Sequence, residues 1–430
     1  MSFLPQNWDI VPFSRLATYK VGKTPSRAND AFWKQSSATI PWVSIADMRP
    51  YADVVHTKEK ITLEAFQTVF RGQIVPKGTL LMSFKLSIGR IAYLSQDACH
   101  NEAIISIHPN KEVNTRFLAY FLSYFDYSEL YDRQIKGNTL NKEKIDRIPV
   151  VCPPPKEQDS IAAVLDLIRK GITIAEKKQT LLMGLKHATM HKLFTCGLRN
   201  EPQKETEIGL MPKSWEPTTI GDFALKAQYG LSLRGNNKGK YPILRMNCQV
   251  DGKVEFKDLQ YVDIDNDAFL SFKLYHRDIL FNRTNSIEHV GRTAIYNHHD
   301  DAVFASYLVR VSVDAEKCIP EFLNYYMNWP TTQWEIKKLA SRAVGQANIN
   351  ATKLRTVKVP LPETIEEQQE IVDVLDAIDR KIDLHRRKKA VLEELFKSLL
   401  HKLMTGEVRV DDLDLSALEA MQPQAQGGAV

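Results

Sequence analysis

The chain has 430 residues, a formal net charge of +5 at pH 7 and a hydrophobic fraction of 43%. This length exceeds the usual size of one domain, so at least two hydrophobic cores are expected. No stretch approaches the roughly 18 consecutive apolar residues of a membrane span, and the N-terminal MSFLPQNWD lacks the apolar centre of a signal peptide. Five cysteines, odd in number and without a CxxC pair, favour buried thiols over a zinc or redox site. These features predict a cytoplasmic protein that does not use a membrane.

Five segments follow one another along the chain. Each of the two large segments mixes short β-rich runs, such as GTLLMSF and YLVRVSV, with turn residues and one helical stretch, such as RFLAYFLSYFDYSELY. This mixture predicts the α+β class, with a curved or barrel-like sheet in each domain. The predicted order is a first domain at 1–152, a helix at 153–199, a second domain at 200–360, a second helix at 361–409 and a disordered tail at 410–430.

The two helical segments are near copies of each other. KEQDSIAAVLDLI begins at Lys156 and EEQQEIVDVLDAI begins at Glu366, and with a shift of 210 the identities continue without a gap to Arg199 and Arg409. A match of this density indicates an internal duplication. Fainter matches, such as Pro5-x-x-Trp with Pro212-x-x-Trp, extend the duplication into the large segments.

Both copies carry apolar residues at alternating steps of four and three, which is the spacing of a coiled-coil seam. Prolines and a candidate capping box mark where the helices begin, and Gly197 and Gly406 stand where helices commonly end. A single stripe of this kind is more often one face of an ordinary core helix, but two copies of equal phase favour antiparallel pairing with pseudo-two-fold symmetry. The predicted seam consists of Ile161, Leu165, Ile168, Ile172, Leu182, Leu193, Ile371, Leu375, Ile378, Ile382, Leu392 and Leu403.

Positive charge gathers in loops at matching places of both domains. Residues 226–245 contain five basic residues and no acid, and YKVGKTPSRAND occupies the corresponding place in the first domain. Lysine and arginine bind phosphates, while asparagine, glutamine, arginine and serine can contact base edges. One such loop is more often a solvated, flexible loop, but its recurrence favours DNA. The residues predicted to contact DNA are Lys20, Lys23, Thr24, Ser26, Arg27, Lys85, Arg90, Lys136, Asn138 and Asn141 in the first domain, and Arg234, Asn236, Asn237, Lys238, Lys240, Arg245, Arg283, Asn285, Arg292, Arg342, Gln346 and Asn348 in the second.

The duplicated PP…EQ…I…VLD helix, together with P-x-x-W, GKTPS and IPWVSIADM, resembles the specificity subunits of type I restriction-modification systems. The resemblance covers nearly the whole chain, although YGLSLRGNN stands where the first domain has VGKTPSR. It implies two target recognition domains that each read half of an asymmetric, bipartite site in double-stranded DNA. It also implies that the helices form an antiparallel coiled coil that acts as a spacer and docks two modification subunits.

The resemblance further implies that this chain performs no chemistry and binds no cofactor. Adenine N6 methylation with S-adenosylmethionine would belong to the modification subunits, and ATP- and Mg²⁺-dependent translocation and cleavage to restriction subunits. The sequence contains no (N/D)PP(Y/F) or Walker A motif, and we predict neither a catalytic nor a metal site. Glu255-x-Lys257 is an isolated pattern on a predicted strand and is not expected to be catalytic. His187 and His191 do not form an HExxH motif because position 188 is alanine, and His298 with His299 is interpreted as an exposed turn.

Two alternatives remain open at this point. A self-sufficient DNA methyltransferase would methylate DNA without a partner. A coiled-coil scaffold with protein- or carbohydrate-binding end domains would show neither DNA affinity nor a steep loss of binding with salt.

Overall fold

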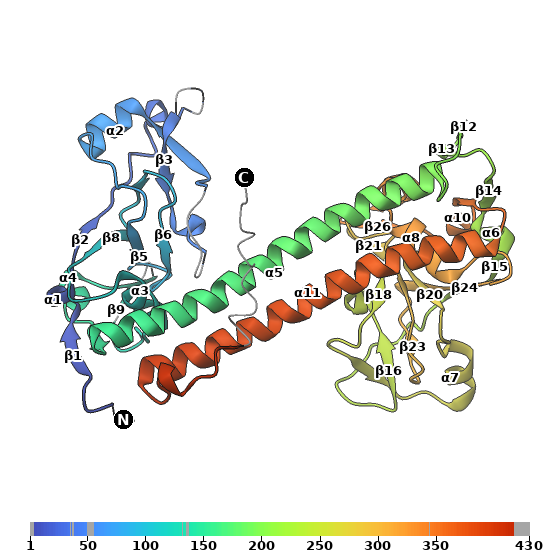
Figure 1. The fold of residues 1–430 in the computed structure, drawn as a ribbon. Helices are drawn as coiled ribbons and strands as arrows, with labels where there is room; N and C mark the ends of the chain where they lie inside the picture. The colour runs from blue at the N-terminus through green and yellow to red at the C-terminus, as the bar shows by residue number, and fades with distance from the viewer. Residues whose placement is uncertain are drawn as a thin grey trace, which may run out of the picture. The chain divides into compact units, whose positions relative to one another are not determined.

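The computed structural model describes residues 4–34, 36, 38–49, 56–130, 132–134, 137–343 and 345–416. The chain divides into two compact units: unit 1 comprises residues 1–176 and 387–430, and unit 2 comprises residues 177–386. Each unit therefore contains one large domain, one half of the first long helix and one half of the second (Figure 1). The predicted α+β class is confirmed. Among the described residues, no helix has the length and apolar character needed to span a membrane.

The domain of unit 1 is built on two main sheets and several short helices. The first sheet has the order β2 (Ala17–Val21), β8 (Ile104–Pro109), β5 (Leu80–Ser83), β6 (Ile91–Tyr93), and the second has the order β4 (Glu59–Thr62), β3 (Ala38–Val43), β7 (Cys99–His100). Strands β1 (Asp9–Pro12) and β11 (Pro149–Cys152) pair where the chain enters and leaves the domain, and β9 (Asp132–Gln134) and β10 (Gly137–Thr139) form a hairpin. The short helices are α1 (Phe13–Leu16), α2 (Leu63–Phe70), α3 (Thr115–Tyr124) and α4 (Lys142–Asp146).

Unit 2 repeats this plan with additions. Its main sheet has the order β15 (Ala224–Tyr229), β24 (Leu308–Val313), β20 (Ile279–Asn282), β22 (Thr293–Ile295), β18 (Lys253–Val254), β17 (Gln249–Val250). The other strands are β19 (Gln260–Val262), β16 (Tyr241–Leu244) and β23 (Val303–Phe304); β21 (Thr284–Asn285), β26 (Gln346–Asn348) and β25 (Ser341–Ala343); β14 (Glu216–Thr219) with β27 (Lys358–Leu361); and β12 (Gln203–Thr206) with β13 (Gly209–Pro212). The short helices are α6 (Ile220–Phe223), α7 (Asn266–Phe272), α8 (Pro320–Asn328), α9 (Pro330–Lys338) and α10 (Ala351–Arg355).

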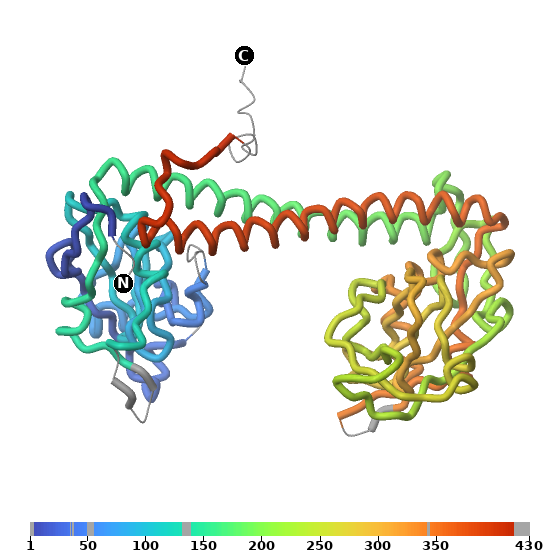
Figure 2. The backbone as a smooth tube through the Cα atoms, turned by 90° about the horizontal axis from the view of Figure 1, so that it is seen from below, coloured from blue at the N-terminus to red at the C-terminus, as the bar shows by residue number. Residues whose placement is uncertain are grey.

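The two long helices, α5 (Pro155–Cys196) and α11 (Ile365–Thr405), run side by side and antiparallel within each unit (Figures 1 and 2). In unit 1, Lys389 pairs with Glu176 at 3.3 Å, and a Cβ atom on Gly171 would lie 3.1 Å from Leu392. In unit 2, Lys186 pairs with Asp379 at 2.7 Å. All three pairs fit one antiparallel register, in which the two residue numbers sum to about 565. The C-terminal glycines take positive φ angles, +66° at Gly197 and +70° at Gly406, as predicted.

The apolar stripe of the helices packs into the domains as well as between the helices. Ile161, Leu165 and Ile168 belong to the core of unit 1 together with Leu392, Leu403 and α3, and Leu193, Ile371 and Leu375 belong to the core of unit 2 together with α8. Ile172, Leu182, Ile378 and Ile382 are half-buried. The prediction of a pure helix-to-helix seam was therefore incomplete, because aromatic residues of α3 and α8 cover the ends of the stripe.

Identical residues of the duplicated phrase dock each helix onto its own domain. Buried Gln158 accepts a hydrogen bond from the backbone N–H of Asn114 at 2.8 Å, and buried Gln368 accepts one from the backbone N–H of Ile319 at 2.8 Å. These N–H groups lie where α3 and α8 begin. Each glutamine also donates to a carbonyl, that of Pro153 at 2.9 Å or Lys317 at 3.1 Å.

The aspartates of the same phrase add a second pair of equivalent contacts. Tyr120 donates to Asp166 at 2.5 Å in unit 1, and Tyr325 donates to Asp376 at 2.6 Å in unit 2. Burial, the first cause, and the neighbouring carboxylates raise the pKa values of both phenols, so both remain hydrogen-bond donors at neutral pH. The two helices therefore resemble each other partly because they bind their own domains in the same way.

The chain after α11 is not a free tail where it is described. Val410, Leu413 and Leu415 pack against the core of unit 1, and Arg409 pairs with Glu157 at 3.0 Å. The prediction of disorder from residue 410 is therefore wrong for 410–416, because these apolar side chains find a covered surface there. Residues 417–430 lie outside the described part of the chain.

A buried histidine makes unit 1 sensitive to acid. Burial, the main cause, lowers the pKa of His100 to about 4, although its ring meets backbone oxygens. The unfolded chain binds this proton near pH 6.5, so stability is full above about pH 6.5 and falls as the pH drops toward 4, by roughly 3 kcal/mol at most. Phe304 holds the equivalent place in unit 2. We expect His100→Phe to flatten the dependence of melting temperature on pH between 6.5 and 4 in scanning calorimetry. Equal slopes for the variant and the wild type would contradict this assignment.

The docking glutamines provide a second prediction. Gln368→Leu leaves the buried N–H of Ile319 without its acceptor, so the free energy of unfolding of unit 2 should fall by about 1–3 kcal/mol. Gln158→Leu should do the same to unit 1. The matched control is Gln369→Leu, because Gln369 is exposed and its side chain hydrogen-bonds to Asp373 on its own helix. Denaturant unfolding in which the control lost as much stability as Gln368→Leu would exclude the docking role.

Candidate nucleic-acid interface

The basic loop of unit 2 is exposed and held at both ends. Gly230 directly follows β15 and lies close to the backbone of residues 304–305, since a Cβ atom there would lie 2.4 Å from the carbonyl oxygens of Phe304 and Ala305. The backbone of Asn236 pairs with that of Tyr261 through bonds of 2.9 and 2.8 Å. The predicted contacts Arg234, Asn236, Asn237, Lys238 and Lys240 are all exposed. The loop therefore presents cations to solvent from a fixed backbone.

The end of the main sheet lies beside this loop and carries further predicted residues. Arg283 follows β20, and its guanidinium lies 4.6 Å from the ring centre of Tyr229, the last residue of β15. Asn348 donates to Thr284 at 2.7 Å, and Gln346 is exposed on the neighbouring β26. Asn285 lies on β21 and donates toward the sulfur of Met246. Strands β21, β26 and β25 form a three-stranded antiparallel ribbon, and its β25–β26 hairpin is the kind of two-stranded element that fits the major groove of DNA.

The matching loop of unit 1 is more strongly tied to its own domain. Arg27 forms two hydrogen bonds with Glu59, at 2.6 and 2.8 Å, and its guanidinium lies 3.7 Å from the ring centre of Trp33. The bond to Glu59 raises the pKa of Arg27. Lys23 donates to the carbonyl of Val69 at 2.8 Å. Lys20 and Ser26 are exposed and Thr24 is half-buried.

Other predicted contacts have structural partners. Asn141 caps α4 by accepting from the N–H of Lys144 at 2.9 Å, and half-buried Arg245 donates to the carbonyl of Asp258 at 2.7 Å. Arg90 reaches the carbonyl of Ile45 at 3.4 Å. Lys85 is half-buried at a bridge to Thr139. Lys136 and the side chains of Asn138 and Arg342 lie outside what the structure describes.

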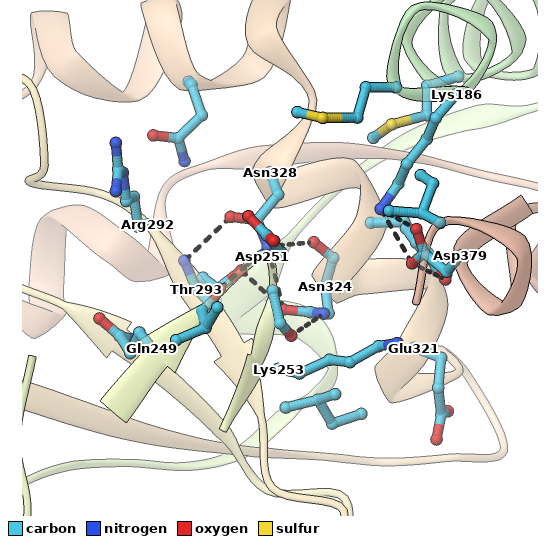
Figure 3. Close-up of a pocket in the computed structure, with 18 of the residues that line it drawn as sticks. Lys186, Gln249, Asp251, Lys253, Arg292, Thr293, Glu321, Asn324, Asn328 and Asp379 are labelled. Carbon is cyan, nitrogen blue, oxygen red and sulfur yellow. Dashed lines mark hydrogen bonds and ion pairs between the residues drawn. The ribbon is translucent and has the colours of Figure 1, made fainter. Parts of the chain in front are cut away.

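Arg292 lines a cavity of about 500 Å³ that sequence reasoning did not anticipate (Figure 3). The cavity lies in unit 2 between the β17–β18 hairpin, α8 and the two long helices. Thr293, Asn324 and Asn328 bond to one another along one wall, with Thr293 donating to Asn324 at 2.9 Å. These groups satisfy each other, as expected for a structural polar network.

Ion pairs cross from the hairpin to α11 at the edge of this cavity. Lys253 pairs with Asp383 at 2.9 Å, and Arg386 pairs with Glu255 at 3.2 Å and Asp251 at 3.9 Å. Glu255, the first residue of the E-x-K pattern, thus binds an arginine. The duplicated positions on α5 hold Thr173 and Glu176, so this set of ion pairs cannot form there.

The titratable groups of the described residues do not converge on a metal site. No group of three or more histidine, cysteine or acidic side chains with metal-binding geometry occurs among them. The ring of His191 packs at a tilt against Trp329, and that of His298 stacks on Phe256. All five cysteines are unpaired and buried or half-buried, and burial raises the pKa of Cys99 to about 12. That thiol stays protonated at neutral pH.

A group of exposed leucines on the long helices of unit 2 was also missed by sequence reasoning. Leu181 and Leu384 are 73% and 62% exposed and lie level with each other in the antiparallel register, and Leu185, one turn from Leu181, is 52% exposed. The heptad pattern gave no signal for them, because they lie off the seam. Exposed leucines at one level of a helix pair are candidates for a protein-binding surface, because large exposed apolar areas commonly mark one. We call Leu181, Leu185 and Leu384 the leucine surface.

Comparisons with known proteins agree with this geometry. The family model for the type I restriction modification DNA specificity domain matches residues 5–182 and 212–394. The chain is 33% identical over 213 residues to the putative type I restriction enzyme MjaX specificity subunit of Methanocaldococcus jannaschii, a match that covers 49% of this chain and 50% of that protein. It is 23% identical to the MjaVIII specificity subunit of the same organism over 96% of this chain and 95% of that protein.

A solved structure has the same fold. The crystal structure of a type I restriction-modification S subunit from M. genitalium matches with a TM-score of 0.59 at 12% identity, and the match covers 94% of this chain and 97% of that one.

Proposed function

The chain belongs to the type I restriction-modification DNA specificity family, and from this premise we propose that it is the subunit that selects the DNA sequence. The single observation that carries this proposal is the duplication: two domains of one plan, with different loop residues, are fixed to two helices that dock in the same way. Two different reading surfaces on one chain suit an asymmetric site with two half-sites in double-stranded DNA.

We infer that the chain carries no catalytic site and recruits subunits that do. Family membership and the specificity subunits among its relatives support this inference. Two modification subunits would bind S-adenosylmethionine and methylate adenine, and restriction subunits would supply ATP- and Mg²⁺-dependent activity. Methylation of DNA by the purified chain alone would contradict this inference.

The exposed loop of unit 2 provides the test of DNA binding. Arg234→Gln and Lys238→Gln together remove two cations expected to contact phosphates. For the chain co-expressed with its methyltransferase subunit, the slope of log affinity against log salt should become shallower by about 2. The matched control is Lys213→Gln with Lys257→Gln, because these lysines are exposed on unit 2 outside the loop. An unchanged slope in the loop variant would contradict phosphate contact, and a wild-type complex without affinity for duplex DNA would contradict the proposed function.

We also propose that the leucine surface binds a modification subunit. Burying an exposed leucine side chain stabilises a complex by roughly 1.5–3 kcal/mol, whereas a buried, unpaired glutamate destabilises it. Leu181→Glu with Leu384→Glu should therefore abolish co-purification of the methyltransferase subunit. Leu225→Glu is the control, because Leu225 is 71% exposed on β15 of the domain rather than on a helix. Undiminished co-purification of the double variant would place the partner elsewhere.

A further inference from the structure

The two domains place equivalent backbone atoms at the sheet end that carries Arg283. The N–H of Arg283 donates to Tyr307 O at 3.0 Å, as the N–H of Phe84 donates to Ala103 O at 2.9 Å. The carbonyl of Arg283 accepts from Ile349 at 2.9 Å, as that of Phe84 accepts from Leu140 at 2.9 Å.

The neighbouring bonds repeat as well. Gly230 donates to Leu308 O at 3.2 Å and Gly22 donates to Ile104 O at 3.1 Å. The two sheet ends can therefore be compared position by position, using one unit as the reference for the other.

At these matched positions the side chains differ in chemistry. Arg283 of unit 2 replaces Phe84 of unit 1, which is a buried core residue. The next position holds Thr284 in place of Lys85, and the position across the ribbon holds Asn348 in place of Thr139. Tyr229 replaces Val21 at the end of the first strand. Since unit 1 forms the same backbone with a phenylalanine, the fold does not require an arginine at this place.

Protein contacts hold the Arg283 guanidinium in position but leave its donors underused. An arginine has five N–H donors. One Nη reaches Ser306 O at 3.4 Å and the other reaches Asn348 Oδ1 at 3.5 Å, both near the long limit of a hydrogen bond. Within the described residues, Nε has no hydrogen-bond partner. The stack on Tyr229 restricts the guanidinium, and Tyr229 is itself fixed because its hydroxyl accepts from the N–H of Ala351 at 2.9 Å.

The surroundings of Arg283 suit a base pair. Tyr229, which stacks on the guanidinium, and Tyr307, whose carbonyl accepts from the N–H of Arg283, are 40% and 49% exposed. The β21–β26–β25 ribbon starts at the residue after Arg283. The exposed cations of the 230–240 loop follow directly from β15. Within unit 2, this ribbon lies at the end of the domain away from the long helices (Figure 2).

We propose that Arg283 is a specificity-determining residue that reads a guanine in the half-site of unit 2, with Tyr229 and Asn348 as its positioning residues. This inference rests on the proposed function. A guanidinium can donate in parallel to O6 and N7 of guanine, a pair of acceptors that no other base presents in the major groove. Unit 1 has no arginine at the matched position, so its half-site is read differently there.

The test uses the chain co-expressed with its methyltransferase subunit and a library of duplexes randomised in both half-sites. We expect Arg283→Gln and Arg283→Phe to lose the preference for guanine at one position of one half-site, on the order of 10-fold to 100-fold. The other half-site should keep its sequence. Arg283→Phe installs the residue that unit 1 uses at this place, so a melting temperature near that of the wild type is expected and separates specificity from folding.

Arg234→Gln is the contrast, because loss of a phosphate contact should weaken binding to all duplexes alike. Unchanged base preferences in both folded Arg283 variants would overturn the role of Arg283, and so would a uniform loss like that of Arg234→Gln. A wild-type complex that selected no bipartite sequence would instead overturn the proposed function on which this role rests.

Discussion

The rest of the structure depends on one repeated constraint, the buried glutamine at the start of each long helix. Gln158 and Gln368 each supply an acceptor to a backbone N–H where a short helix of the domain begins. Gln368 also donates to the carbonyl of Lys317 in the domain, and Gln158 donates to that of Pro153, just before its own helix. An unpaired N–H in these places would be costly, because the surrounding residues exclude water. The glutamine fixes the start of the helix to the domain, and the tyrosine–aspartate bond fixes the rotation of the helix about its own axis. In this orientation the apolar stripe of the helix packs into the domain core. These contacts within the chain are thus one reason why the two helix starts have similar sequences, in addition to any partner subunit that binds them.

The sequence was a good guide wherever a signal was periodic or duplicated. The α+β class, the two long helices, their C-terminal glycines and the order of segments all follow from local patterns that tertiary contacts did not override. The contact of Gln158 with Asn114 could not be predicted, because it joins residues 44 positions apart that show no pattern of their own. The packing of Val410, Leu413 and Leu415 was missed for the same reason: a short apolar group after a helix shows nothing of the surface that covers it.

For the candidate interface, the type of a residue predicted its availability for DNA less well than its surroundings in the structure do. The prediction from sequence assigned a DNA contact to basic and amide residues near turns by residue type alone. In the structure, however, Asn141 caps a helix, and Arg27 stacks on a tryptophan and binds a glutamate. Only the geometry separates these from Arg234 and Lys238, which project from a pinned loop into solvent. Comparing matched positions in the two domains adds information that one domain alone does not provide. It separates side chains that the fold requires from side chains that can change without altering the fold.

The ion pairs at the edge of the cavity fit the domain of unit 2 to its own long helix, so this domain would not fit equally well in the place of the other domain. The hairpin of unit 2 offers Asp251, Lys253 and Glu255 to Asp383 and Arg386 of α11, and each charge meets its opposite. A domain of this type transplanted into unit 1 would meet Thr173 and Glu176 at the duplicated helix positions, so its two acids would face an acid and its lysine would lose its carboxylate. Moving the second domain to the first position would therefore require that its hairpin lose these charges or that α5 change with it.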